Sequence, residues 1–171
     1  MKCINILKDD QYEFNGITHN RKVARGILIN DKKEVCLLHV VTIDDFGNRN
    51  YYETPGGGVN DNEDINKAII REIKEETGFN SEIICEIGYV EDDYNLIKRH
   101  NINYYYLLKV TSFEKEMLEE YEKSVILEKV WVSIDKAIQL YENMGKEKIE
   151  ILVKRRELPI LLIAKKLLEE L

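Results

Sequence analysis

Acidic side chains interrupt the apolar stripe of one segment that has the spacing of a helix. Ile65, Ile69 and Ile73 recur every four residues, which places them along one face. At about 100° per residue, Glu72 and Glu76 continue this face, one turn apart, where the pattern requires core residues. Carboxylates in such positions lose water and repel each other, so either basic partners or divalent cations must stabilise them.

Divalent cations explain this acidic cluster better than basic partners do. Glu75 lies on the flank of the same helix, and Arg71, four residues before it, is the nearby candidate for a basic partner. One guanidinium group cannot neutralise three carboxylates. Clustered carboxylate oxygens suit Mg²⁺ or Mn²⁺, which bind a few carboxylates, waters and substrate phosphates. The preceding glycines, Gly56, Gly57 and Gly58, can add a backbone carbonyl ligand and let phosphate oxygens come close. The pattern predicts metal-assisted chemistry at a phosphate group.

Residues 57–79 resemble the Nudix box, G-x5-E-x7-R-E-U-x-E-E-x-G-U, in which U is an aliphatic or bulky apolar residue. All seven fixed positions match, and Ile73 and Phe79 occupy the two U positions. Since each fixed residue type occurs at roughly one position in ten, a chance match to all seven anywhere in the chain is on the order of 10⁻⁵ or rarer. A looser likeness extends over about residues 20–145, a range that includes strand-like segments on both sides of the box.

The resemblance implies a MutT-like Nudix hydrolase with an α/β/α sandwich fold. Such enzymes use Mg²⁺ or Mn²⁺ to hydrolyse a pyrophosphate bond in a nucleoside diphosphate linked to another moiety. By this likeness Glu72 and Glu76 are expected to bind the metal. The Gly57 carbonyl would complete the ligand set, and Glu75 would be either a further ligand or the catalytic base.

The same likeness assigns supporting roles around the reaction. Arg71 would orient the glutamates by charge-assisted hydrogen bonds, and Glu63 would brace the loop at the start of the helix. Water would attack one phosphorus atom, with Glu75 as a candidate base. A base from a distant acidic stretch is the alternative, although that stretch also has the composition of a solvated surface. Its glutamates are Glu119, Glu120, Glu122 and Glu128.

The substrate is less well defined than the metal site. Arg25, on an early strand, is a candidate phosphate contact, and a surface salt bridge is its alternative role; the glycine run at 56–58 is a second candidate contact. We expect a small nucleotide-type substrate. A nucleotide sensor without turnover is the alternative function, and isomerase chemistry on a diphosphate would share the metal site. The intact glutamate cluster favours the hydrolase.

Composition limits the other classes of function. The chain has 171 residues, which predicts a single domain, and it is 44% hydrophobic and 33% charged, unlike a disordered protein. A net charge of -7 argues against binding to nucleic-acid polymers or membrane surfaces, which require excess Lys and Arg. The three cysteines are far apart and predict reduced thiols, and residues 1–10 lack the apolar run of a signal peptide. We therefore expect a cytoplasmic protein.

The elements that must position the site alternate irregularly between strands and helices. This predicts an α/β sandwich with a mixed sheet. Pro159 is expected at the start of a C-terminal helix over about residues 157–171, which either packs on the core or forms a homodimer contact. The predicted strands are 22–30, 34–43, 51–54, 83–90, 102–110 and 129–132, and the other predicted helices are 63–77 and 133–144.

Overall fold

The computed structural model describes all residues from 1 to 171, and every predicted strand and helix is present with somewhat different bounds. The strands are β1 (Cys3–Leu7), β2 (His19–Ile29), β3 (Val35–Asp44), β4 (Gly47–Glu53), β5 (Gly56–Gly58), β6 (Phe79–Tyr94), β7 (Arg99–Phe113) and β8 (Ile126–Val132). The helices are α1 (Ile65–Thr77), α2 (Glu120–Val125), α3 (Ile134–Glu142) and α4 (Lys148–Glu169), with a 3-10 turn at Asn95–Ile97.

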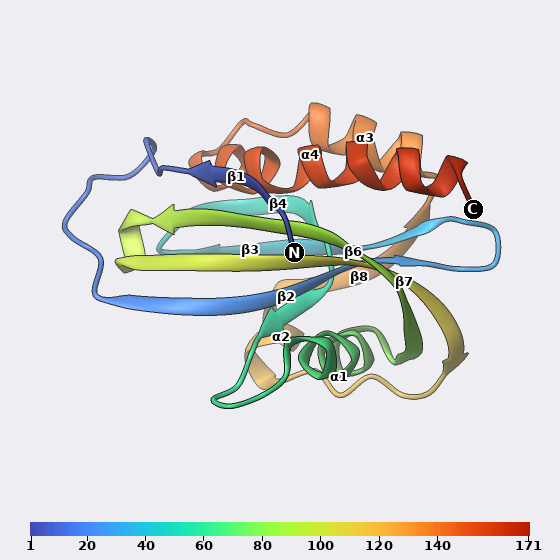
Figure 1. Cartoon of the computed structure of the whole chain (residues 1–171). Coiled ribbons are helices and arrows are strands. Elements are labelled where there is room, and N and C mark those ends of the chain that lie inside the picture. Colours follow the sequence, from blue (N-terminus) through green and yellow to red (C-terminus); the bar gives the residue numbers. More distant parts are fainter.

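The strands form one sheet that separates two helical layers (Figure 1). The strand order is β1-β6-β7-β2-β3-β4, with β5 paired to β2 and β8 paired to β3. β1 pairs with β6 and β2 with β7 in parallel, whereas the other pairs are antiparallel, so the sheet is mixed as predicted. Helices α3 and α4 cover one face, and α1 and α2 lie on the other. The α/β/α sandwich is therefore confirmed. No helix combines the length and apolar character needed to cross a membrane.

Helix α1 is held at both ends and along one face. The Asp64 side chain accepts hydrogen bonds from two backbone N–H groups of the first turn, and Gly78, with a φ of 76°, ends the helix as predicted. Ile69 and Ile73 are fully buried against the sheet. The helix comes close to β2 at Gly26, where an added Cβ would lie 2.8 Å from the Ile73 side chain. These contacts fix the face of α1 that carries the acidic residues.

The C-terminal helix is longer than the sequence suggested. It begins at Lys148 and continues through Pro159 to Glu169, so the prediction of a helix start at Pro159 was wrong. A proline within a helix removes one backbone hydrogen bond and disfavours the helical form. Ile160 and Leu161, directly after it, are fully buried in the main core. Their burial holds the helix across the proline.

A buried carboxylate on α4 connects this helix to the glycine run on the other side of the sheet. Glu157 is fully buried and accepts hydrogen bonds from the backbone N–H of Thr54 at 2.9 Å and from the Tyr141 hydroxyl at 2.5 Å. It also forms ion pairs with Arg156 at 3.0 Å and with Arg25 at 3.5 Å. Because Thr54 lies shortly before β5, these contacts fix the start of the glycine-containing strand.

We expect the Glu157→Ala variant to lose about 3–5 kcal/mol of unfolding free energy, because it leaves the buried Arg156 without its nearest carboxylate. Urea unfolding followed by circular dichroism measures this difference. Glu169→Ala, at an exposed position of the same helix, is the control and should change stability by less than about 0.5 kcal/mol. Equal stability of the two variants would contradict a structural role for the Glu157 network.

Candidate active site

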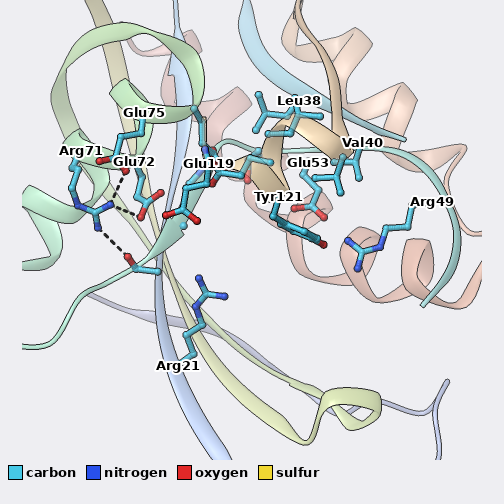
Figure 2. A pocket seen from close by; sticks show the side chains of 18 of the residues that line it. Arg21, Leu38, Val40, Arg49, Glu53, Arg71, Glu72, Glu75, Glu119 and Tyr121 are labelled. Atoms are coloured by element: carbon cyan, nitrogen blue, oxygen red, sulfur yellow. Dashed lines mark hydrogen bonds and ion pairs between the residues drawn. The ribbon is translucent and has the colours of Figure 1, made fainter. Parts of the chain in front are cut away.

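A cavity of about 490 Å³ opens where α1, α2, β5 and the neighbouring strands meet (Figure 2). Most of its wall is polar, and acidic side chains from several elements face it. The charged residues that line it are Arg21, Arg49, Glu53, Arg71, Glu72, Glu75, Glu76, Glu119 and Glu122. The box residues Gly57, Arg71, Glu72, Glu75 and Glu76 thus line one cavity, together with residues from elements outside the box, whereas Glu63 does not line it.

Three carboxylates come together at the wall formed by α1 and α2. Carboxylate oxygens of Glu72, Glu76 and Glu122 all lie within 4.8 Å of one another. Glu72 and Glu76 are each only 7% exposed, which confirms that they continue the buried face of α1. Burial raises the pKa of Glu76 well above its usual range and also raises the pKa of Glu72, although Arg71 opposes the shift at Glu72. The cluster concentrates negative charge where water is largely excluded.

Arg71 organises the glutamates on the exposed side of this cluster. Its guanidinium group donates two hydrogen bonds to Glu63, each 2.8 Å long, and one each to Glu72 at 2.7 Å and Glu75 at 2.9 Å. It also donates to the Gly58 carbonyl at 3.0 Å, which ties the helix to β5. The hydrogen bonds from Arg71 are the main reason why the pKa of Glu63 falls to about 2. Arg71 therefore has the contacts that the Nudix resemblance implied for it.

The position of Glu75 differs from that of the three clustered carboxylates. Its carboxylate pairs with Arg71, and its oxygens are not among those that come within 4.8 Å of each other. The third carboxylate of the cluster is that of Glu122, which comes from α2, far away in sequence. The roles of Glu75 as a ligand or as the base stay predictions.

The glycine run allows the strand to approach the acidic cluster closely. β5 pairs with β2, with Gly57 opposite Ala24. An added Cβ at Gly57 would collide with the Glu72 carboxylate, and one at Gly56 would collide with the backbone of Ala24. The N–H group of Gly56 donates a 2.6 Å hydrogen bond to Glu76. The sequence predicted that these glycines let phosphate oxygens come close to the backbone. In the structure, the backbone at Gly56 and Gly57 comes close to carboxylates of the protein itself.

Arg25 lies beside this cavity and has carboxylate partners of its own. Its side chain is 12% exposed, and Nη1 lies 3.4 Å from Glu53 and 3.5 Å from Glu157. Nη1 also donates a 3.1 Å hydrogen bond to the Thr54 carbonyl. Two roles for Arg25 therefore remain: a phosphate contact, and membership of an ion-pair network, which is buried and not at the surface as expected. Its contact with a phosphate stays a prediction.

The four glutamates proposed as a distant base separate into two groups. Glu119 and Glu122 line the cavity, whereas Glu120 pairs with Lys123 and Glu128 contacts His39. The backbone N–H of Glu119 donates to the Glu122 carboxylate at 2.7 Å as part of a capping box at the start of α2. The E-x-x-E spacing could have indicated this cap. It could not have indicated that α2 brings Glu122 close to the carboxylates of α1. Sequence reasoning also did not identify the cavity residues Arg21, Arg49, Glu53 and Tyr121.

The chain matches a family model described as the NUDIX domain over residues 19–154. Similar solved structures include a NUDIX hydrolase from Nitrosomonas europaea, with a TM-score of 0.60, 18% identity and coverage of 79% of this chain and 86% of that one. The MutT protein from Methanosarcina mazei Go1 has a TM-score of 0.57 and 22% identity, with coverage of 84% and 95%. A MutT NUDIX hydrolase from Burkholderia pseudomallei has a TM-score of 0.57 and 18% identity, with coverage of 69% and 86%. No curated protein matches the chain in sequence.

The raised pKa of Glu76 predicts a pH-dependent instability of the metal-free protein. A carboxyl whose folded pKa exceeds its ordinary value of 4.5 stabilises the fold below that value, and this contribution is lost as pH rises through the folded pKa. In a chelator, wild type should therefore lose stability relative to Glu76→Gln as pH rises above 4.5. The amide oxygen of the variant can still accept the Gly56 hydrogen bond. Urea unfolding at each pH gives the comparison, and parallel pH profiles would contradict it.

Proposed function

Because this chain belongs to the Nudix family of pyrophosphohydrolases, we propose that it hydrolyses a pyrophosphate bond with the help of a divalent cation at the glutamate cluster. The substrate in this proposal is a nucleoside diphosphate linked to another moiety. The observation that carries the proposal is the convergence of Glu72, Glu76 and Glu122, whose oxygens lie within 4.8 Å of one another.

The donor set fits a hard cation such as Mg²⁺ or Mn²⁺. All three groups are carboxylates, and such cations prefer oxygen ligands. Two of the three are buried, and no basic side chain forms an ion pair with Glu76, so the cluster lacks the counter-charge that burial requires. In our proposal Glu72, Glu76 and Glu122 hold the cation, with the Gly57 carbonyl as a further ligand. When bound, the cation offsets the charge of the pyrophosphate oxygens and makes phosphorus easier for water to attack.

The other residues of the box orient this set. Arg71 holds Glu72 in place, and the N–H of Gly56 holds Glu76. Glu63 accepts hydrogen bonds from Nε and Nη2 of Arg71 and braces the loop before α1. In the proposed reaction Glu75, which lines the cavity and is one-third exposed, accepts the proton of the attacking water. The glycines of β5 line the same cavity and offer backbone contacts to the pyrophosphate.

The first test is hydrolysis of a panel of nucleoside triphosphates, nucleotide sugars, ADP-ribose and dinucleoside polyphosphates, with products identified by ³¹P NMR. We expect cleavage that requires Mg²⁺ or Mn²⁺ and that falls by at least about 100-fold in Glu76→Gln. Tight binding of one compound without cleavage would favour a nucleotide sensor. Cleavage that is independent of metal would contradict the proposed role of the cluster.

The role of Glu122 has its own test, since its place in the cluster depends on α2. Glu122→Gln retains an oxygen for the capping hydrogen bond but loses the charge, so we expect the Mg²⁺ concentration for half-maximal activity to rise at least about tenfold. Glu120→Gln is the matched control, because Glu120 lies on the same helix but pairs with Lys123 outside the cavity. Equal Mg²⁺ dependence of the two variants would remove Glu122 from the proposed ligand set.

A further inference from the structure

A second cavity, of about 390 Å³, adjoins the first and has a different charge. Arg21, Gly56 and Gly57 line both cavities, so the second one begins at the edge of the proposed reaction site. Aromatic side chains such as Phe46 and Tyr94 form part of its wall. Its charged lining is mostly basic: Arg21, Arg25, Arg49, Arg99 and Arg156, with Glu53.

Three of these five arginines are neutralised by carboxylates of the protein, and two are not. The pairs are Arg25 with Glu53 and Glu157, Arg49 with Asp44, and Arg156 with Asp92 and Glu157. Arg21 and Arg99 take part in no ion pair within 4 Å. Their positive charges are therefore available to a ligand.

Arg21 and Arg99 are close neighbours on one face of the sheet. β2 and β7 run parallel with His19 opposite Arg99 and Arg21 opposite Asn101, so side chains two residues apart point to the same side. Figure 2 shows Arg21 extending from β2 toward the glutamates. An added Cβ at Gly58 would lie 2.7 Å from the Arg21 guanidinium, which places that group beside the glycine run.

Arg99 forms no ion pair with a carboxylate, and the nearby Asp92 carboxylate is paired with Arg156 instead. The Nε atom of Arg99 is buried and has no hydrogen-bond partner. Burial and then the charge of Arg21 lower the pKa of Arg99, so the two cations oppose each other. The neighbouring Asn101 is only 1% exposed; its amide nitrogen donates to Asp92, and its Oδ1 has no partner. Unsatisfied polar groups therefore gather at this wall, where a polar ligand would satisfy them.

We propose that Arg21 and Arg99 form a subsite for a phosphate group of the substrate that is not part of the bond cleaved at the glutamate cluster. This inference rests on the proposed function, because it defines the substrate of the same reaction. A phosphate monoester carries about -1.5 to -2 charges near pH 7 and matches two guanidinium groups better than a single carboxylate does. The preferred substrates are nucleotide derivatives that bear an additional phosphate on the part lying in the second cavity.

The kinetic test uses pairs of compounds that share a pyrophosphate bond and differ by one phosphate, namely ATP with ADP and NADPH with NADH. Wild type should cleave the phosphate-rich member of at least one pair with the higher kcat/KM. Arg99→Gln should lower that preference ratio by about 10- to 100-fold, as expected for lost hydrogen bonds to a charged group. Lys22→Gln is the control, because Lys22 is exposed and lines neither cavity. A ratio near one in wild type, or a ratio unchanged in Arg99→Gln, would overturn the subsite.

Binding of inorganic phosphate in a chelator, measured by NMR titration, separates this inference from the proposed hydrolysis. If no compound is cleaved, the hydrolase proposal fails, and the subsite is then judged by binding alone. Weaker phosphate binding in both Arg21→Gln and Arg99→Gln than in Lys22→Gln supports it, and equal binding in all three overturns it. Because Arg99 has no ion-pair partner, we expect the melting temperature of Arg99→Gln to be at least that of wild type, so misfolding should not imitate the effect.

Discussion

The burial of carboxylates on the core face of α1 is the constraint on which the rest of the site depends. Glu72 and Glu76 continue the same face as Ile69 and Ile73, so the hydrophobic packing that fixes the helix also removes water from these acids. Arg71 compensates Glu72 from the side. Glu76 receives only a backbone N–H from β5, and its raised pKa reflects that incomplete compensation. Gly56 and Gly57 of β5 follow from the same constraint, since a side chain at Gly57 would collide with the Glu72 carboxylate and one at Gly56 with the backbone of β2.

The parts of the site that could be predicted from sequence are those that a single helix specifies. Helical spacing is enough to place Glu72 and Glu76 on the buried face and Arg71 beside them, because the relation between these residues is local. The contribution of Glu122 depends on the contacts of α2 with β3 and β8, which bring it to the carboxylates of α1 across a sequence separation that no periodicity describes. Arg25 illustrates the opposite case. Its position on an early strand suggested a phosphate contact, yet the structure also gives it Glu53 and Glu157 as partners, one of them from the distant helix α4.

The fold shows the same division between local and distant information. Strand-forming segments and helix caps such as Gly78 could be predicted from local composition, and the mixed character of the sheet followed from their irregular alternation. The parallel pairing of β2 with β7 is a long-range relation that composition does not encode, and it is this pairing that places Arg21 near Arg99. The start of the C-terminal helix was predicted wrongly at Pro159, because the local preference of proline for a helix start is outweighed by burial of the residues that follow it. Tertiary packing overrides local preference at that position.

The distribution of charge explains how a chain with a net charge of -7 can accept an anionic substrate. The negative charge at the site is concentrated at the cluster of Glu72, Glu76 and Glu122, where a metal cation can compensate it. The adjoining cavity has five arginines, and two of them, Arg25 and Arg156, pair with the buried carboxylates Glu157 and Asp92. Those carboxylates pair with Arg25 and Arg156 and form no ion pair with Arg21 or Arg99. Overall charge therefore gives no guide to the substrate. The uncompensated charges on each side of the glycine run are a better guide to the substrate. A ligand that spans both cavities would have to present cation-binding oxygens to the glutamate cluster and negative charge to Arg21 and Arg99.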